Sequence, residues 1–193
     1  MAWAAEMCAY VDSHSSHDVS LWRADFGYPV GSVVWSARVD SLHAMNEGFA
    51  ALADDNGYHT MVEKGLEYLT TPPEDEFRQM IHGGSGDTPP PIGSVATVTT
   101  AVVANGRYAD AMAWGVEMAQ LVEEVTSLPT MFLIDSFGTF GSVTWISGAP
   151  DLATADTTGE AINTNADYLK RLEAGGDLFV PASGQRGLLT RIA

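Results

Sequence analysis

The stretch MAWAAEMCAYV, from Met1 to Val11, recurs as MAWGVEMAQLV, from Met112 to Val122. Met, Ala, Trp, Glu, Met and Val stand at the same six positions of both stretches. The match continues along the chain, because FGYPVGSVVW, starting at Phe26, matches FGTFGSVTW, starting at Phe137, once one residue is left out. A register kept over so many residues predicts a chain made of two copies of one structural unit.

The second copy shows the pattern of this unit most completely. Its first segment, Ser94–Ala104, is rich in valine and threonine and predicts a strand, and apolar residues at helical spacing predict a helix from about Tyr108 to Val125. Strands over Thr130–Phe137 and Gly141–Ser147, a helix over Leu152–Ala174 and a last strand in the tail from Leu178 complete the copy. This order, βαββαβ, is that of the ferredoxin-like unit.

The first copy follows the same order but starts inside its first helix. We expect a helix over Met1 to about Asp12, strands over Val19–Phe26 and Gly31–Val39, a helix over Ser41–Tyr68, and a last strand within Glu76–His82. Nothing corresponds to the strand Ser94–Ala104, and the missing strand would leave backbone groups unpaired. We expect that the natural chain starts upstream of Met1; the alternative is that another segment or another chain fills the place.

The same alignment predicts the domain organisation. Residues 1–82 form the first, N-terminally incomplete repeat, and residues 94–193 form the second. The segment between them, 83–93, reads GGSGDTPPPIG, a flexible stretch followed by a stiff one, and is predicted to be a linker.

Three stretches of the second copy carry a resemblance to a known family. They are NGRYADAMAWGVEMAQLV from Asn105, FGTFGSVTWIS from Phe137, and DYLKRLEAGGDLFVPASGQRGLLTRI from Asp167. The chain resembles the dimeric α+β barrel superfamily, above all its NIPSNAP-like branch, and departs from it at the absent first strand and at Ala182-Ser183-Gly184, where the usual glycine comes late.

The resemblance implies an α+β fold in which two ferredoxin-like repeats pack sheet to sheet as a pseudo-dimeric α+β barrel. The superfamily includes antibiotic-synthesis monooxygenases, heme-degrading enzymes, muconolactone isomerases and proteins with no known activity. The fold therefore does not select a function, and no catalytic residue carries over from the NIPSNAP-like pattern.

The charge of the chain excludes some partners. Asp and Glu number 25 against 9 Lys and Arg, and the formal net charge is −16. Such a surface repels phosphate backbones and anionic membranes, so we expect no nucleic acid and no membrane among the partners. No apolar run approaches the roughly 20 residues of a membrane helix, and a cytoplasmic protein is predicted. The single cysteine, Cys8, aligns with Ala119 and is interpreted as a small packing residue.

A charged pair in the first copy is the main candidate for a ligand site. Arg23 and Asp25 alternate with Trp22 along a predicted strand and so share one face of the sheet, and the second copy has Ile134 and Ser136 at their positions. In a cavity on that face, the arginine could hold a carboxylate or enolate and the aspartate could move a proton. The alternative is an intramolecular ion pair.

All five histidines belong to the first copy or its end. Because the second copy lacks them, the fold common to both copies does not require them, and they could serve a functional site. His43 and His59, at opposite ends of the second helix, are further ligand-binding candidates, with solvent exposure or a helix seam as the alternative. His14 and His17 are three residues apart and are weak candidates for a transition metal, but no third ligand is evident and a solvated helix end is the alternative. We expect no resident metal.

These observations favour a small-molecule-binding protein, possessing no cofactor, whose ligand lies in a cavity of the first repeat near Trp22, Arg23 and Asp25. The first alternative is a cofactor-independent monooxygenase or isomerase that acts on an enolisable or aromatic compound. The second is an assembly or interaction protein that uses an open sheet edge, and a homo-oligomer is compatible with each of these readings.

Overall fold

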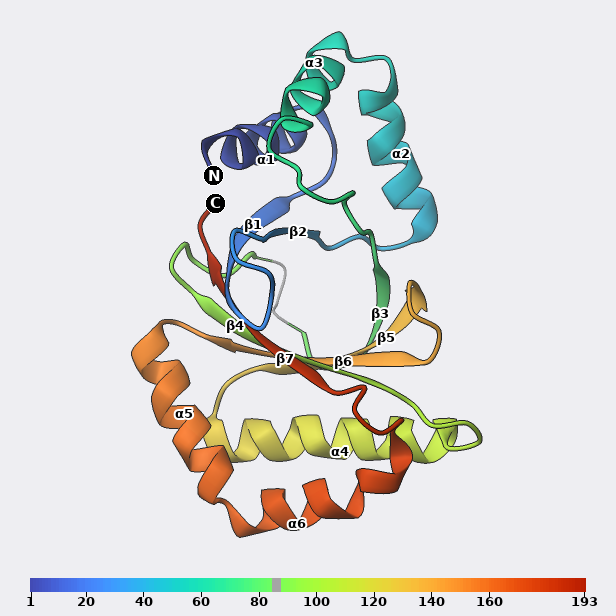
Figure 1. The fold of residues 1–193 in the computed structure, drawn as a ribbon, viewed down its shortest axis with the longest axis vertical. Helices are drawn as coiled ribbons and strands as arrows, with labels where there is room; N and C mark the ends of the chain where they lie inside the picture. Colours follow the sequence, from blue (N-terminus) through green and yellow to red (C-terminus); the bar gives the residue numbers. More distant parts are fainter. Residues whose placement is uncertain (85–87) are drawn as a thin grey trace.

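A computed structural model describes residues 1–84 and 88–193, so the part of the predicted linker at 85–87 lies outside the described residues. Helices and strands alternate in groups along the chain (Figure 1). The helices are α1 (Ala2–His14), α2 (Leu42–Ala53), α3 (Asn56–Gly65), α4 (Tyr108–Thr126), α5 (Leu152–Thr164) and α6 (Ala166–Ala174), with a 3-10 turn, η1 (Gly176–Leu178). The strands are β1 (Val19–Phe26), β2 (Val33–Ala37), β3 (Phe77–His82), β4 (Val95–Val102), β5 (Thr130–Phe137), β6 (Ser142–Ala149) and β7 (Gln185–Arg191).

The seven strands form one antiparallel sheet in the order β2-β1-β7-β4-β6-β5-β3. Two of its pairings join the halves of the chain: β7 pairs with β1, and β3 pairs with β5. The sheet curls, so that β1 and β2 face β4, β6 and β5 across the middle of the molecule (Figure 1). The predicted α+β fold is confirmed at this level, and it is consistent with a dimeric α+β barrel.

The curled sheet has an apolar interior and a helix-covered exterior. Alternate residues of a strand point to opposite faces, and on β1 Trp22 and Ala24 point inward. There they pack in one apolar cluster with Val98 of β4 and Leu189 of the neighbouring strand β7. Leu21 points outward and packs with Ala4 and Cys8 of α1. On the other exterior, Phe132 of β5 packs with Ala111 and Ala119 of α4. Figure 1 accordingly shows α1–α3 outside one layer and α4–α6 outside the other.

Most predicted elements are present with similar bounds, but the second helix of each copy is broken. Asp55 ends the first segment because its carboxylate accepts hydrogen bonds from the backbone N–H groups of Gly57 and Tyr58, which caps a new helix, α3. Asn165 caps α6 through the N–H of Tyr168 in the same way. Asp and Asn are favoured at the start of a helix because a side-chain oxygen satisfies an unpaired N–H there.

The same tryptophan contacts recur in both halves. Trp3 Nε1 donates to the carbonyl of Met61 at 2.9 Å, and Trp114 Nε1 donates to the carbonyl of Arg171 at 3.0 Å. A second tryptophan crosses each of these at right angles, Trp35 on Trp3 and Trp145 on Trp114, with 5.8 Å between ring centroids in both cases. These residues pack the first helix of each half against its sheet, as the shared sequence positions indicate.

Glycines at the C-terminal ends of α3 and α6 make room for the tryptophan rings. A Cβ atom on Gly65 would lie 2.1 Å from the Trp3 ring, and one on Gly175 would lie 2.4 Å from the Trp114 ring. No side chain fits at either position without displacing a tryptophan. Across the described residues, no helix has both the length and the apolar character that crossing a membrane requires.

Candidate functional site

The structure places Arg23 and Asp25 on one face of β1, as their alternation predicts, and pairs them directly. Arg23 Nε lies 2.6 Å from Asp25 Oδ1, and Thr190 of β7 donates its hydroxyl hydrogen to Asp25 Oδ2. This face is the exterior one that Leu21 shares, whereas Trp22 points into the sheet interior. The pair therefore does not lie in a cavity with Trp22, and its guanidinium is already engaged.

The environment of Asp25 favours its charged form. Burial of the carboxyl raises its pKa, but the hydrogen bonds from Arg23 and Thr190 and the charge of Arg23 together leave the pKa of Asp25 below its ordinary value. The Asp25 side chain is 14% exposed and the Arg23 side chain 50% exposed. An ionised, paired carboxylate accepts hydrogen bonds well but is a weak proton acceptor, which makes Asp25 a poor general base.

The two histidines predicted as ligand-binding candidates lie on separate helices of the first half. His43, near the start of α2, has its Nε2 3.6 Å from Glu47 Oε1, and its side chain is almost fully exposed. His59 of α3 places its Nε2 2.7 Å from the carbonyl oxygen of Ala53. Within the described residues no hydrogen bond or ion pair brings either histidine to Arg23 or Asp25.

The two histidines considered for a metal point apart. His14 stacks on Tyr10, with 4.0 Å between ring centroids, and its Nδ1 lies 3.0 Å from the Tyr10 carbonyl. His17 is buried against Phe49, and its Nε2 lies 3.1 Å from the carbonyl of Met45. In the described part of the chain, no three His, Cys, Asp or Glu side chains gather in a way that could hold a metal ion.

Two neighbouring hollows lie on the exterior of the sheet in the second half, where α5 crosses β4 and β7. The larger has a volume of about 300 Å³ and the smaller about 40 Å³. Thr97, Ala155 and Arg186 border both. The larger is lined by Phe26, Thr97, Leu152, Ala155, Asp156, Arg186, Gly187 and Leu188, so Phe26 is the contribution of the first half. We call the two together the α5 hollows.

Arg186 is the cation of the α5 hollows. It belongs to β7, where it lies opposite Thr99 of β4, and it lines both hollows together with Thr97 of β4 and Ala155 of α5. Among the described residues, its guanidinium has no hydrogen bond or ion pair. Two other arginines of the second half, Arg107 and Arg171, each have a carboxylate oxygen within 3.5 Å. Arg186 is thus available to an anion that enters the hollows.

The second charged group of the larger hollow is Asp156, on α5. Its side chain is exposed, and it carries a negative charge to the same lining as Arg186. A cation and a carboxylate on one apolar lining are the groups that a proton transfer with oxyanion stabilisation requires.

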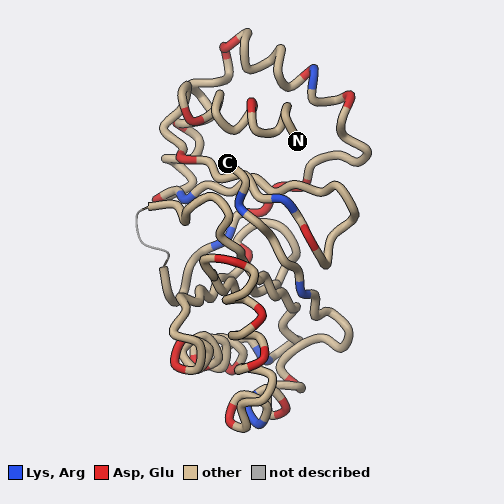
Figure 2. The backbone as a smooth tube through the Cα atoms, turned by 90° about the vertical axis from the view of Figure 1, so that its left-hand side faces the viewer, with Lys and Arg blue, Asp and Glu red and all other residues tan. Residues whose placement is uncertain are grey.

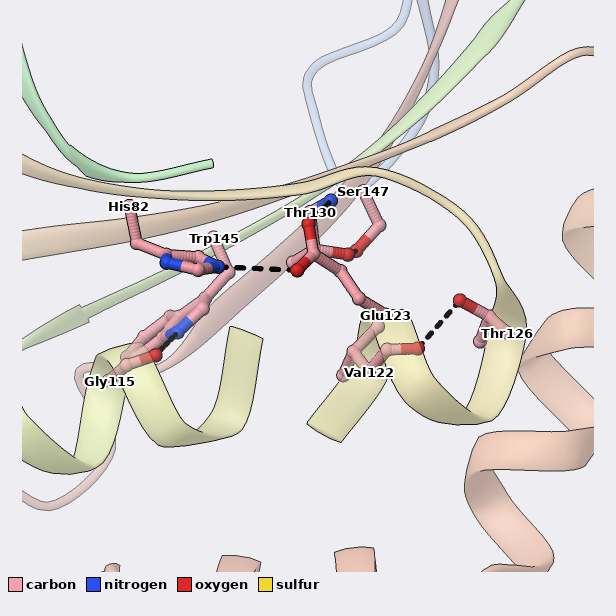
Figure 3. A network of polar contacts seen from close by, with 8 residues as sticks. All are labelled: His82, Gly115, Val122, Glu123, Thr126, Thr130, Trp145 and Ser147. Carbon is pink, nitrogen blue, oxygen red and sulfur yellow. Dashed lines mark hydrogen bonds and ion pairs between the residues drawn. The ribbon is translucent and has the colours of Figure 1, made fainter. Parts of the chain in front are cut away.

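Hydroxyl groups line the smaller hollow, and a chain of polar contacts fixes one of its walls (Figure 3). Ser147 Oγ lies 3.0 Å from Thr130 Oγ1, and the Thr130 N–H donates to Glu123 Oε1 at 3.1 Å. The other oxygen of Glu123 lies 3.2 Å from His82 Nε2, so this chain also ties β3 of the first half to α4 of the second. Since Ser147 is held through this chain, the hollow has a preformed polar wall.

Sequence reasoning missed the α5 hollows. Arg186 stands in the tail of the second copy, where the sequence match between the copies does not fix one register, so no position of the first copy is matched to it. One signal was present: Arg186 is one of only 9 cationic residues in a strongly acidic chain, and it lies in a segment predicted as a strand. Nothing in the sequence placed Asp156 opposite it.

The interior of the sheet contains a cluster of charged residues near the β3 edge. Arg78 Nε lies 3.0 Å from Asp135 Oδ1, and Arg78 also pairs with Glu76. The Asp135 side chain is 1% exposed, and within the described residues its Oδ2 has no hydrogen-bond partner, nor has the hydroxyl of the buried Thr144. Buried polar atoms of this kind are commonly bridged by water.

Comparison with known proteins identifies the fold and not a family. No model of a known protein family matches the chain, and no curated protein matches it in sequence. Three solved structures share the fold over nearly the whole chain, at identities that carry no information beyond the fold.

The first is a proposed monooxygenase from Fusobacterium nucleatum, with a TM-score of 0.68 and 6% identity over 100% of this chain and 84% of that one. The second is a proposed monooxygenase from Lactobacillus acidophilus, with a TM-score of 0.58 and 9% identity over 97% of this chain and 87% of that one. The third is an anthrone oxidase-like protein, with a TM-score of 0.60 and 13% identity over 98% of this chain and 84% of that one.

Proposed function

We propose that the chain binds a small, mostly apolar molecule with an acidic oxygen in the α5 hollows and oxidises it with dioxygen, without a cofactor. The observation that carries this proposal is the guanidinium of Arg186, which has no partner in the described part of the chain and lies on the lining that both hollows share. The larger hollow, about 300 Å³, has the size of a site for a small organic ligand.

The lining favours a planar apolar ligand with one anionic edge. Phe26, Leu152 and Leu188 offer apolar surface in the larger hollow, and an aromatic ring gains free energy by leaving water for such a surface. Arginine presents a planar fork of N–H donors that pairs well with a carboxylate, phenolate or enolate oxygen. The ligand site predicted for the first half ranks second because Arg23 is already paired with Asp25 and Trp22 lies on the other face of the sheet.

The same two charged groups support an oxidation. In an enolisable ketone, the proton leaves the carbon next to the aromatic ring and passes to Asp156, and the negative charge that develops on oxygen is held by Arg186. The enolate gives one electron to dioxygen, and the substrate radical and superoxide combine into a peroxide anion on that carbon. The peroxide takes back the proton held by Asp156, and the resulting hydroperoxide loses water. A CH₂ group and O₂ thus become C=O and H₂O, with the carbon oxidised and dioxygen reduced.

The names of the three structurally similar proteins support an oxidation, although each name describes only the protein that carries it. Two are proposed monooxygenases and one is anthrone oxidase-like, and anthrone is a planar, enolisable ketone. The cofactor-independent monooxygenase is therefore favoured over the isomerase, because no observation on the α5 hollows points to a shift of a double bond.

The test is oxygen uptake with anthrone. The wild-type chain is expected to consume dioxygen in an anthrone-dependent way and to yield anthraquinone. Arg186→Met, which keeps the apolar stem and removes the charge, should lower kcat/KM by about tenfold or more, the usual scale for losing an oxyanion-stabilising group. Asp156→Asn should lower kcat with less effect on KM, because it removes a proton acceptor and keeps the shape of the site.

The matched control is Arg107→Met, which removes an exposed arginine outside both hollows. It should leave the uptake rate unchanged. Saturable anthrone binding with no oxygen uptake would reduce the proposal to a binding protein. Wild-type activity in Arg186→Met would refute the site.

The finer architecture belongs to the same proposal. We infer that the two halves are tandem copies of one ferredoxin-like unit, at 1–82 and 94–193, and the recurring contacts of Trp3 and Trp114 support this. The relation to the NIPSNAP-like branch stays a prediction, because the neighbours are similar in fold alone.

A further inference from the structure

The strands β2 and β3 form the two edges of the curled sheet. Within the described residues, β2 pairs with β1 and with no other strand, and β3 pairs with β5 and with no other strand. Parts of both edges are exposed to solvent, notably Ser36 and Ala37 on β2 and Gln79 and Ile81 on β3. Unpaired edges of this kind accept further strands.

The second half shows what such a pair of edges can hold. Its strands β6 and β7 correspond in order to β2 and β3, and each pairs antiparallel with one strand that lies between them, β4. Within the described residues, no strand of the first half stands in the place of β4. In that half, each edge therefore lacks the partner that its counterpart has.

We propose that β2 and β3 bind one extended polypeptide segment as an eighth strand, antiparallel to both, with the uncharged, β-branched character of β4. The segment continues a hydrogen-bonded sheet that is established on both sides of it. It is a partner of defined chemistry: about eight residues, like Val95–Val102, with small or β-branched side chains and no charge.

The backbone groups that would bind the segment can be assigned on β2. The N–H of Ala24 donates to the carbonyl of Ser32 at 3.1 Å, so the hydrogen-bonded pairs with β1 are those of the even-numbered residues of β2. In an antiparallel ladder the intervening residues direct their backbone groups to the other side. The N–H and C=O groups of Val33, Trp35 and Ala37 thus face the open side.

The hydrogen bonds of β4 show which of its residues bond to each neighbouring strand, and a segment that resembles β4 would follow the same pattern. Val103 N donates to Gly141 O on the β6 side, and Arg191 N of β7 donates to Ser94 O. Odd-numbered residues of β4 therefore bond to β6 and even-numbered residues bond to β7. In the first half, Thr99 of the segment would bond to β2 and Val98 would bond to β3.

The side chains around the edges fit an uncharged segment. Inward-facing neighbours on β2 include Val34, which belongs to the interior apolar cluster, and outward-facing neighbours include Val33 and Trp35, which pack with α1. The inward cation on β3, Arg78, is already paired with Glu76 and Asp135. A charged residue in the middle of the segment would find no partner among these groups.

The experiment uses a synthetic peptide with the sequence SVATVTTAVVA, that of Ser94–Ala104, labelled with fluorescein and titrated with the whole chain. Fluorescence anisotropy is expected to show saturable binding of one peptide per protein. Two further peptides carry a single N-methyl group, on the residue equivalent to Thr99 or to Val98. Because each blocks one of the two edges, each should bind about tenfold more weakly or worse.

Protein variants test the β2 edge itself. Ala37→Pro removes an N–H that faces the open side and leaves the ladder with β1 in place, so it should weaken peptide binding about tenfold. Ala37→Ser, the matched control, keeps the N–H and should bind like the wild type. If Ala37→Pro does not fold, the N-methylated peptides still decide.

Three results would overturn the proposal. The first is no saturable binding of the unmodified peptide. The second is a loss with only one of the two N-methyl peptides, which means that a single edge is used. The third is a dimer, seen by light scattering, that Ala37→Pro converts to a monomer, which means that the edges pair with a second copy of the chain. None of these results bears on the α5 hollows, so this inference and the proposed function fail separately.

Discussion

At the scale of single residues, the charge pair inside the sheet has the clearest energetic consequence. Asp135 is almost wholly buried, and one of its oxygens accepts from Arg78 while the other has no partner within the described residues. A buried carboxylate needs a compensating cation, because removing the charge from water costs free energy. This cost can exceed the free energy gained by forming the ion pair. The pair therefore matters most when one member is removed.

Arg78→Met is expected to lower the free energy of unfolding by about 3 kcal/mol, because it leaves the Asp135 carboxylate buried and unpaired. The double variant Arg78→Met/Asp135→Leu should recover most of that loss, since it removes both charges and fills the space with apolar groups. Urea unfolding measures both values. A double variant that is no more stable than Arg78→Met would show that the pair is not the cause.

At the scale of elements, the break between the two short helices of each half has a local cause. Asn165 Oδ1 accepts from the N–H of Tyr168 at 2.9 Å and thereby starts α6, and Asp55 does the same for α3. The two residues occupy corresponding places in the halves. The cap of Asn165 sets the start of α6 directly after α5.

Asn165→Ala should lower the free energy of unfolding by about 1 kcal/mol, the usual loss when an Asn cap is replaced by Ala. For a chain of this length the melting temperature should fall by roughly 2–4 °C. The control is Asn163→Ala, an exposed position of α5 that makes no cap. Equal shifts in the two variants, by differential scanning calorimetry, would count against the cap.

The elements themselves could be predicted from the sequence because apolar periodicity and turn residues are local signals. The strands over Val19–Phe26 and Thr130–Phe137 have the predicted bounds, and α4 ends within one residue of the prediction. The broken helices were not predicted, since Asp55 and Asn165 stand inside stretches whose apolar spacing continues past them. The cap signal was present in the sequence and was outweighed by the spacing.

The candidate site was less accessible to sequence analysis than the elements. That Arg23 and Asp25 share a face follows from the two-residue period of a strand, and the structure shows them on one face. Which face is covered by helices, and which points inward, depends on pairings between distant strands. Arg186 and Asp156 lie on different elements that only the folded sheet and α5 bring to one lining, so no local pattern could join them.

At the scale of the whole molecule, the halves are held together by strand exchange. The last strand of each half, β3 or β7, pairs with a strand of the other half, β5 or β1, and the two meet in one sheet. The formal charge of −16 is spread over both helical layers, as Figure 2 shows for the acidic residues. Even in a molecule of such charge, Arg186 has no carboxylate partner among residues 1–84 and 88–193, and the proposed function rests on this cation in the α5 hollows.

The most direct measurement of that claim is the side-chain NMR signal of arginine Nε–Hε groups, recorded on ¹⁵N-labelled chain during titration with 1-naphthoate, a planar aromatic carboxylate. The Arg186 signal, assigned through its loss in Arg186→Met, is expected to shift in a saturable way. The signals of Arg107 and Arg171, which are paired and lie outside the α5 hollows, should stay in place. An unmoved Arg186 signal, or equal shifts of all three, would contradict the assignment of the α5 hollows as the ligand site.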